Sequence, residues 1–196
     1  MTPSALFYGK LPSAELALDG AELAARLKMK REAALSLSAD YESALRAALD
    51  AGYVGMRTPF LLTEGKTVDF GFAAFESRDL CRHLSGCKEA LLLCVTLGFG
   101  VDRLLQRAAV RAASEQFVLD AYASAFAEAA LSLALRKTAE GASLTLGFGV
   151  GYGDFSLTAQ APLLAALKAR ERLSVSLTKT LLMSPSKTIT AVFGVR

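Results

Sequence analysis

The segment 114–137 constrains the fold more than any other part of this sequence. Its polar residues fall almost entirely on one i, i+4 series, and most of the remaining residues are Ala, Leu, Phe, Val and Tyr. The series consists of Gln116, Asp120, Ser124, Glu128, Ser132 and Arg136. A helix with one narrow polar stripe is buried over most of its circumference. We therefore expect a long central helix, whose stripe either faces water or, around Glu128, faces a ligand cleft.

The continuous apolar run 89–97 has the length of a strand, and a strand without polar alternation is buried on both faces. We expect this strand to be central in a sheet. Further strands are expected at 4–8, within 53–75, at 173–178 and at 187–193. Helices are expected at 22–32, 39–51, 77–84, 102–113 and 155–171. Because these helices and strands do not alternate strictly, the pattern indicates an α+β fold with a largely antiparallel sheet.

A chain of 196 residues is long enough for one domain with a substantial apolar core. We expect a single domain over 1–196, with a mostly helical N-terminal part at 1–52 and a sheet-containing core at 53–196. Asp19 is the expected cap of the first helix, and Gly52 is the expected stop of the second. Since no proline separates these two helices, one long kinked helix is the alternative.

Glycine occupies every second position of Gly147–Gly153, with Phe148, Val150 and Tyr152 between. Four glycines in alternation suggest a place where another backbone or a ligand comes close. The stretch is expected to deliver Tyr152 and Asp154 to the N-terminus of the helix that follows. An ordinary glycine-rich turn is the alternative.

Residues 145–150 repeat the six residues Thr-Leu-Gly-Phe-Gly-Val that also occupy 96–101. Both copies are expected to end a strand and to precede a helix. Six residues are too few to demonstrate a duplication, so the match predicts only two similar strand-to-helix corners.

The composition argues against several classes of protein. Hydrophobic residues make up 53% of the chain and the mean hydropathy is +0.35, which fits helices packed through alanine or an obligate partner surface. The net charge is +3, and the one basic cluster, at 26–31, has no interleaved aromatic residues. That cluster indicates a solvated helix face rather than nucleic-acid binding. With no signal-peptide pattern and no charge-free run of about 18 residues, we expect a cytoplasmic protein without a membrane segment.

The three cysteines and the single histidine lie close together in sequence, at Cys81, His83, Cys87 and Cys94. An odd number of cysteines without a secretory signal argues against a disulfide framework. Their spacing also lacks the CxxC knuckle of structural zinc sites. We expect buried free thiols and an exposed histidine, with a metal site as the alternative.

Several common catalytic motifs are missing from the sequence. The glycine stretch is not a GxGxxG motif, because Tyr152 stands in the place of the third glycine, and no Gly-Lys-Ser/Thr follows it. Neither a GxSxG elbow nor an HExxH helix occurs. Asp120 and Glu128 lie about 12 Å apart along a helix axis, which is too far for a glycosidase pair. The residues therefore support a ligand cleft without naming a reaction.

Four segments together resemble the activation domain of cobalamin-dependent methionine synthase, and particularly its short stand-alone relatives. They are 84–98, 120–129, 147–160 and 183–194, and their order and spacing match over roughly 75–194. The resemblance implies an α+β fold with a bent antiparallel sheet and flanking helices. It also implies a domain that binds S-adenosylmethionine and presents the methyl group to cobalamin during reductive reactivation. The cobalamin would be carried by a partner, either a corrinoid-binding protein or a methionine synthase that lacks its own activation domain.

The resemblance also implies the ligand-binding residues. The family's Pro-Gly-Tyr segment falls on Val150, Gly151 and Tyr152, so that the backbone would cradle the ligand and the tyrosine would contact it. Gly149 and Gly153 flank this segment. The acidic residue of the family's long helix falls on Glu128, which would hold the amino group or a ribose hydroxyl of the ligand.

The sequence departs from the family pattern at two positions of this motif. Gly147 stands where the family has an arginine, and Val150 stands where it has a proline. Either another cation such as Lys187 substitutes for the arginine, or the protein is a non-catalytic interaction module. Such a module would dock a corrinoid protein without binding S-adenosylmethionine.

Overall fold

The computed structural model describes residues 5–30, 39–139 and 141–196. Its main sheet has four antiparallel strands in the order β1-β2-β6-β9. These strands are β1 (Leu6–Lys10), β2 (Gly52–Thr58), β6 (Glu89–Thr96) and β9 (Thr188–Val195). The fold thus confirms the expected combination of helices with an antiparallel sheet. The N-terminal segment supplies the edge strand β1.

Strand β6 is central, as its apolar composition predicts. It pairs with β2 on one side and with β9 on the other, and all of its residues after Glu89 are buried. Alternate side chains enter two separate hydrophobic cores. Leu93 belongs to the first core and Leu92 to the second, because successive side chains of a strand point to opposite faces.

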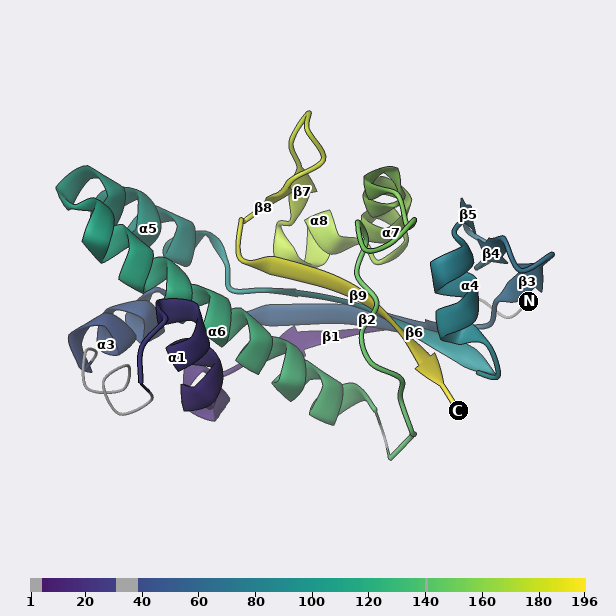
Figure 1. Cartoon of the computed structure of the whole chain (residues 1–196), viewed down its shortest axis with the longest axis horizontal. Helices are drawn as coiled ribbons and strands as arrows, with labels where there is room; N and C mark the ends of the chain where they lie inside the picture. Colours follow the sequence, from purple (N-terminus) through teal and green to yellow (C-terminus); the bar gives the residue numbers. More distant parts are fainter. Residues whose placement is uncertain (1–4, 31–38, 140) are drawn as a thin grey trace.

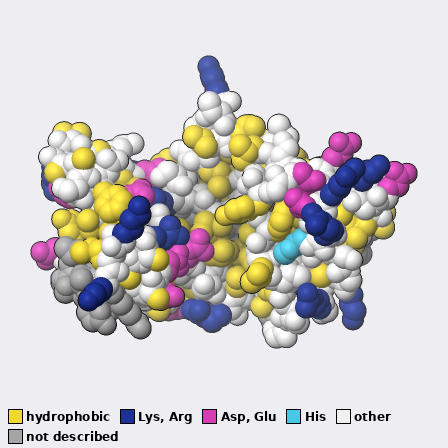
Figure 2. Space-filling view, viewed as in Figure 1, with side chains coloured by type: hydrophobic (Ala, Val, Ile, Leu, Met, Phe, Trp, Pro, Cys, Tyr) yellow, Lys and Arg dark blue, Asp and Glu magenta, His cyan; other side chains and the backbone are white. Residues whose placement is uncertain are grey.

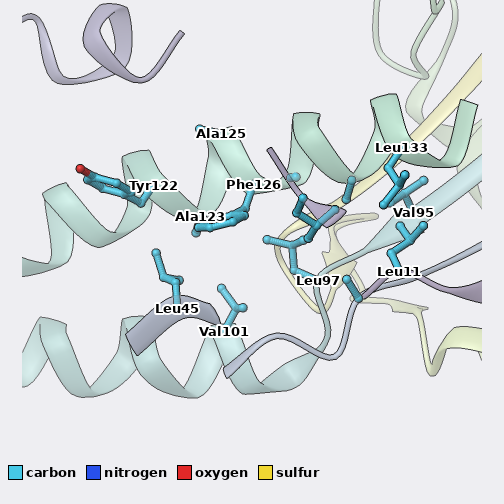
Figure 3. Packing of buried hydrophobic residues seen from close by; sticks show 14 of the residues in the cluster. Leu11, Leu45, Val95, Leu97, Val101, Tyr122, Ala123, Ala125, Phe126 and Leu133 are labelled. Atoms are coloured by element: carbon cyan, nitrogen blue, oxygen red, sulfur yellow. The ribbon is translucent and has the colours of Figure 1, made fainter. Parts of the chain in front are cut away.

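The first core lies under helices on one face of the sheet. These helices are α1 (Gly20–Leu27), α3 (Ala39–Ala48), α5 (Phe99–Arg111) and α6 (Ala113–Thr138). Helix α6 runs diagonally across this face (Figure 1), and its Tyr122 and Phe126 are fully buried. Figure 3 shows Phe126 pointing toward Leu45 and Val101, which come from α3 and α5. The nearly all-apolar helix is therefore covered from several sides, as the sequence predicts.

The second core lies on the opposite face of the sheet. It is covered by α4 (Arg78–Leu84), α7 (Gln160–Ala166), α8 (Ala169–Leu173) and a small sheet of β3 (Leu61–Thr63), β4 (Thr67–Asp69) and β5 (Ala74–Glu76). Aromatic rings join these elements, since the ring of Phe75 lies 5.9 Å from that of Phe70 and 5.7 Å from that of Phe155. Short 3-10 turns occur at η1 (Ser13–Glu15) and η2 (Leu157–Ala159), and a small hairpin pairs β7 (Ser176–Leu177) with β8 (Met183–Ser184).

By length and composition α6 could cross a membrane. However, 56% of its most apolar 18-residue window is buried inside the fold. Helix α6 therefore has the burial of a core helix in a globular domain.

Several expected elements differ in the structure. The helix expected at 155–171 is replaced by η2, α7 and α8. Lys168, which adopts a left-handed conformation with φ 51°, separates α7 from α8. Ser174 is also left-handed, with φ 57°, so the strand expected at 173–178 is reduced to β7. Gly52 does not stop a helix, because α3 ends at Ala48 and Gly52 begins β2.

The first helix is capped by Asp19, whose Oδ1 accepts a hydrogen bond from the Ala21 amide at 2.8 Å, as expected. It ends at Leu27, because Lys28 adopts a left-handed conformation with φ 54°. One long kinked helix continuing into α3 is therefore wrong. The rest of the expected helix and of the basic cluster, from residue 31 on, lies outside the described residues.

Candidate functional site

The glycine stretch follows the outer edge of β9. Isolated antiparallel bridges join Leu144 to Val195 and Phe148 to Val192. The chain then turns sharply, since the Gly151 amide donates to the Phe155 carbonyl at 2.8 Å and the Tyr152 amide donates to the Gly149 carbonyl at 3.2 Å. The expected strand-to-helix corner is therefore wrong for the second copy, because a loop and a 3-10 turn precede the next α-helix.

The loop's own packing explains its glycines. A Cβ on Gly149 would lie 2.6 Å from the ring of Tyr152. Gly151 has φ +92° and Gly153 has φ +55°, which are left-handed conformations that disfavour other residues. The carboxylate of Asp79 also occupies the space of a Cβ on Gly153. The close approach expected from the sequence is thus made by the protein's own side chains, and a ligand contact at these glycines stays a prediction.

Tyr152 presents the largest exposed side chain of this loop, at 67% exposure. Leu146, at 87%, and Leu157, at 49%, are also exposed beside it. Val150 is half-buried and packs against the second core. Among the residues expected to bind a ligand here, Tyr152 therefore offers a side chain, and Gly151 and Gly153 offer exposed backbone. Gly149 is buried under the Tyr152 ring, and Val150 packs against the protein.

Glu128 lies in the middle of α6, where α6 faces α1. Partial burial raises the pKa of the Glu128 carboxyl, and the nearby Glu22 raises it further, whereas Arg26 opposes the shift. Arg26 binds Glu22 at 2.6 Å but reaches the Glu128 carboxylate only at 3.9 Å. With respect to the described residues, Glu128 is therefore a half-exposed carboxylate with one distant cation, which leaves it able to accept hydrogen bonds from a ligand.

The rest of the polar stripe divides between water and protein contacts. Gln116, Ser132 and Arg136 are exposed, as the water-facing alternative predicts. Nearer the middle, the Lys187 ammonium binds Asp120 at 2.8 Å and Ser124 at 2.9 Å. The Lys187 side chain is only 14% exposed. It is held against α6 by these contacts, and its substitution for an arginine at position 147 stays a prediction.

The glycine stretch crosses the edge strand β9 from one face of the sheet to the other, because Gly147 lies against the core under α6 whereas Phe148 and Val150 pack against the second core. A Cβ on Gly147 would lie 3.0 Å from the ring of Phe193 and 3.5 Å from Ala191, and both residues belong to the core under α6. Figure 1 shows the segment after α6 crossing β9 and continuing toward α7 on the other side of the strand in this view. Within the described part of the chain, no hydrogen bond or ion pair joins Glu128 to 147–153.

Figure 2 shows hydrophobic side chains near the middle of this face, with acidic and basic side chains beside them. Five surface depressions of about 280–490 Å³ are lined by described residues, and none of these five is lined by Glu128 or by 147–153. The largest of the five lies at the first copy of the repeated sequence, against Gly98 and Gly100. The cleft expected around Glu128 is thus not among them.

Two of the three cysteines are buried as expected, whereas Cys87 is half-buried and the histidine is not exposed. Cys81 and Cys94 are buried, and all three cysteines are free. Burial raises the pKa of the Cys94 thiol to about 12. His83 is half-buried rather than exposed, and burial lowers its pKa. In the described residues no group of three potential metal ligands occurs.

Asp154 binds the N-terminus of α4, whereas the sequence pattern predicts that it lies at the N-terminus of the helix after the loop. Its carboxylate accepts hydrogen bonds from the Ser77 hydroxyl and from the Arg78 amide, the latter at 2.9 Å. It therefore caps the N-terminus of α4, not that of the helix following the loop. The Ser77 hydrogen bond is the main cause that lowers the pKa of Asp154. No local signal could indicate this contact, because 77 positions separate the two residues.

Comparison with known proteins adds one structural match. No family model and no curated protein sequence matches the chain. The crystal structure of the MetH reactivation domain bound to AdoHcy superposes with a TM-score of 0.77, covering 98% of this chain and 79% of that one at 13% sequence identity. At this identity the match shows the fold. The chain therefore has the fold of the MetH reactivation domain, which confirms the fold implied by its resemblance to the activation domain of methionine synthase.

Proposed function

We propose that this cytoplasmic protein binds S-adenosylmethionine between Glu128 and the loop 149–153, and presents its methyl group to cobalamin on a partner protein. The partner would be a corrinoid-binding protein or a methionine synthase without its own activation domain. The observation that carries the proposal is the fold, because the structural neighbour is a reactivation domain bound to AdoHcy. The family-like sequence segments support it, since they fall on the loop beside β9 and on α6.

The residues present fit parts of such a ligand. The Glu128 carboxylate is half-exposed and can accept hydrogen bonds from an amino group or ribose hydroxyls. The exposed ring of Tyr152 offers an apolar face and a hydroxyl for an adenine or ribose. Position 147 supplies no cation for the ligand's carboxylate, since it is glycine.

The proposed role is one of positioning. The methyl group would pass to the cobalamin of the partner and leave S-adenosylhomocysteine, and a separate reductant would supply one electron. This chain would hold the methyl donor in line with the acceptor, and such positioning can lower a barrier without acid–base chemistry. That role agrees with the lack of the common catalytic motifs in the sequence.

Titration calorimetry tests the proposal. S-adenosylmethionine and S-adenosylhomocysteine should both bind saturably to the wild-type protein. Glu128→Gln should weaken binding about tenfold to a hundredfold, because it removes a charge-assisted hydrogen bond. Gln116→Ala, on the exposed end of the same stripe, is the matched control and should bind like the wild type. An absence of saturable heat at millimolar ligand would contradict the proposal.

A second candidate function is an interaction module that docks a corrinoid protein without binding the nucleoside. Two observations favour it, namely the glycine at 147 and the ion pair that already occupies Lys187. Gly147→Arg distinguishes the two candidates. If the wild type does not bind S-adenosylmethionine and the arginine variant does, the fold retains the site but the natural protein does not use it. That result would support the second candidate. If the wild type binds and arginine only tightens binding, the first candidate stands.

A further inference from the structure

The loop 147–153 is attached to the short helix α4 at both of its ends. His83, in the last turn of α4, contacts the residues at the entrance of the loop. The residue directly after the loop, Asp154, binds the first residues of α4. Sequence positions that are about 60 to 80 residues apart thus meet at one helix.

At the entrance, the segment lacks regular pairing with β9. Between its two bridges the segment advances by four residues, from Leu144 to Phe148, whereas β9 advances by only three, from Val195 to Val192. The Thr145 hydroxyl fills the gap, because its oxygen accepts a hydrogen bond from the Gly194 amide at 2.8 Å. The same oxygen lies 2.9 Å from Nε2 of His83.

The imidazole of His83 also packs on the aromatic residue at the entrance. Its ring lies 5.1 Å from the ring of Phe148, with an interplanar angle of 33°. His83 therefore contacts both Thr145, whose hydroxyl binds β9 in the irregular stretch, and Phe148, which makes the second bridge to β9. Figure 2 shows the histidine at the surface of this face, beside hydrophobic side chains.

At the exit, the contacts with α4 are reciprocal. The Asp154 carboxylate accepts hydrogen bonds from the Arg78 amide at 2.9 Å and from the Asp79 amide at 3.2 Å. The Asp154 amide donates in return to the Asp79 carboxylate at 3.2 Å. That carboxylate lies so close to Gly153 that it occupies the position of a Cβ. The exit of the loop is therefore fixed by several hydrogen bonds and by close packing.

We infer that α4 is a clamp for the candidate ligand loop, and that His83 and Asp154 are positioning residues that fix its entrance and its exit. The inference rests on the proposed function for the identity of the ligand, but the clamp itself does not depend on a ligand. A loop whose backbone is fixed at both ends loses less conformational entropy when it binds, so the backbone that carries Tyr152 is already in place for the ligand.

Amide hydrogen exchange on the unliganded protein tests the clamp. Thr145→Val keeps the shape of the side chain but removes the hydroxyl, whereas Thr145→Ser keeps the hydroxyl. Exchange across 145–153 should be at least about fivefold faster in Thr145→Val, because the contacts of the hydroxyl with the Gly194 amide and with His83 are both lost and one lost hydrogen bond alone has about this effect. It should be near the wild-type rate in Thr145→Ser. Unchanged exchange at β6 amides would show that each variant is folded.

The histidine gives a second pair of variants. His83→Leu should also speed exchange at 145–153, while His83→Gln, which keeps a hydrogen-bonding group at similar reach, should restore slow exchange. Asp154→Asn should loosen the exit end, at 151–153. Wild-type exchange in both Thr145→Val and His83→Leu would overturn the clamp.

Titration with S-adenosylhomocysteine separates the clamp from the proposed function. Weaker binding in Thr145→Val and His83→Leu, with recovery in Thr145→Ser and His83→Gln, would support the positioning role. Faster exchange with unchanged affinity would overturn that role. If the wild type does not bind the ligand but exchange still responds to the variants, the proposed function fails and the clamp stands.

Discussion

The two copies of Thr-Leu-Gly-Phe-Gly-Val have one sequence and two structures. In 96–101, Leu97 is fully buried and α5 begins at Phe99, so the copy forms the corner between a central strand and a helix. In 145–150, the equivalent Leu146 is 87% exposed and no helix begins. The second copy is an irregular edge segment that leads into the candidate ligand loop.

What surrounds each copy explains the difference. The first copy packs against backbone, because a Cβ on Gly100 would overlap the carbonyl oxygen of Ala48. The second copy packs against side chains, because a Cβ on Gly149 would meet the exposed ring of Tyr152 at 2.6 Å. A side chain at the surface can move aside, whereas the backbone of α3 cannot move without disturbing the first core. The first copy is thus a corner packed against backbone, whereas beside the second copy the Tyr152 side chain can move while α4 holds the loop backbone.

Alanine at the fifth position of each copy should give the largest contrast. Gly100→Ala should destabilise the protein by about 3 kcal/mol, because the new methyl group displaces the backbone of α3. Gly149→Ala should change stability by less than about 0.5 kcal/mol, since the Tyr152 ring is exposed and can swing away. Urea unfolding followed by circular dichroism measures both. Equal losses in the two variants would contradict the proposed difference in rigidity.

Alanine at the third position should give a smaller contrast of the same sign. Gly98 has φ +83° and lies against Asp50, with 3.0 Å from an added Cβ to the nearest atom. Gly98→Ala should therefore cost about 1–2 kcal/mol from backbone strain. Gly147→Ala requires the Phe193 ring to shift by a few tenths of an ångström, and we expect a loss below about 1 kcal/mol. Unfolding curves in which Gly147→Ala is the less stable variant would argue against this view.

Elements specified by local signals are predicted well from the sequence. The apolar run of β6, the cap at Asp19 and the polar stripe of α6 each determine a structure through nearby residues. The second glycine copy is predicted wrongly, because its local sequence is identical to the first and only β9 and α4 distinguish it. Position in the fold, not propensity, decides between corner and loop.

The candidate site likewise contains residues that the sequence indicates and contacts that it does not. Tyr152 and the position of Glu128 on a long helix follow from sequence pattern and resemblance. The contacts of His83 with Thr145 and of Asp154 with α4 join residues that are 62 and 76 positions apart. Such pairs have no periodicity or cap signal that one sequence can reveal. The break at Lys168 likewise has no glycine or proline at the left-handed residue to mark it.

Acidification should loosen the second copy more than the first. Burial lowers the pKa of His83 below its usual 6.5, so the unfolded chain binds this proton more readily than the folded protein does. The contribution of neutral His83 is therefore complete above pH 6.5 and falls as the pH drops through that value. The pKa of Asp154 is lowered from 3.8, mainly by the Ser77 hydrogen bond, so its contribution is lost only in stronger acid.

Hydrogen exchange at pH 7.5 and pH 5.0, corrected for the intrinsic rate, measures this effect. Protection of 145–150 should decrease at the lower pH, and protection of 96–101 should stay the same. His83→Gln should remove most of the pH dependence of the second copy. Parallel changes in the two copies would instead indicate a global loss of stability.

The central claim is that the second copy and its loop, rather than the first copy and the depression beside it, hold an S-adenosyl ligand. Titration of the isotope-labelled protein with S-adenosylmethionine, followed by two-dimensional NMR of the backbone amides, tests it most directly. The account predicts saturable shifts at Glu128 and across Gly149–Gly153, with 96–101 unchanged. Shifts confined to 96–101, or no saturable shift at millimolar ligand, would contradict it.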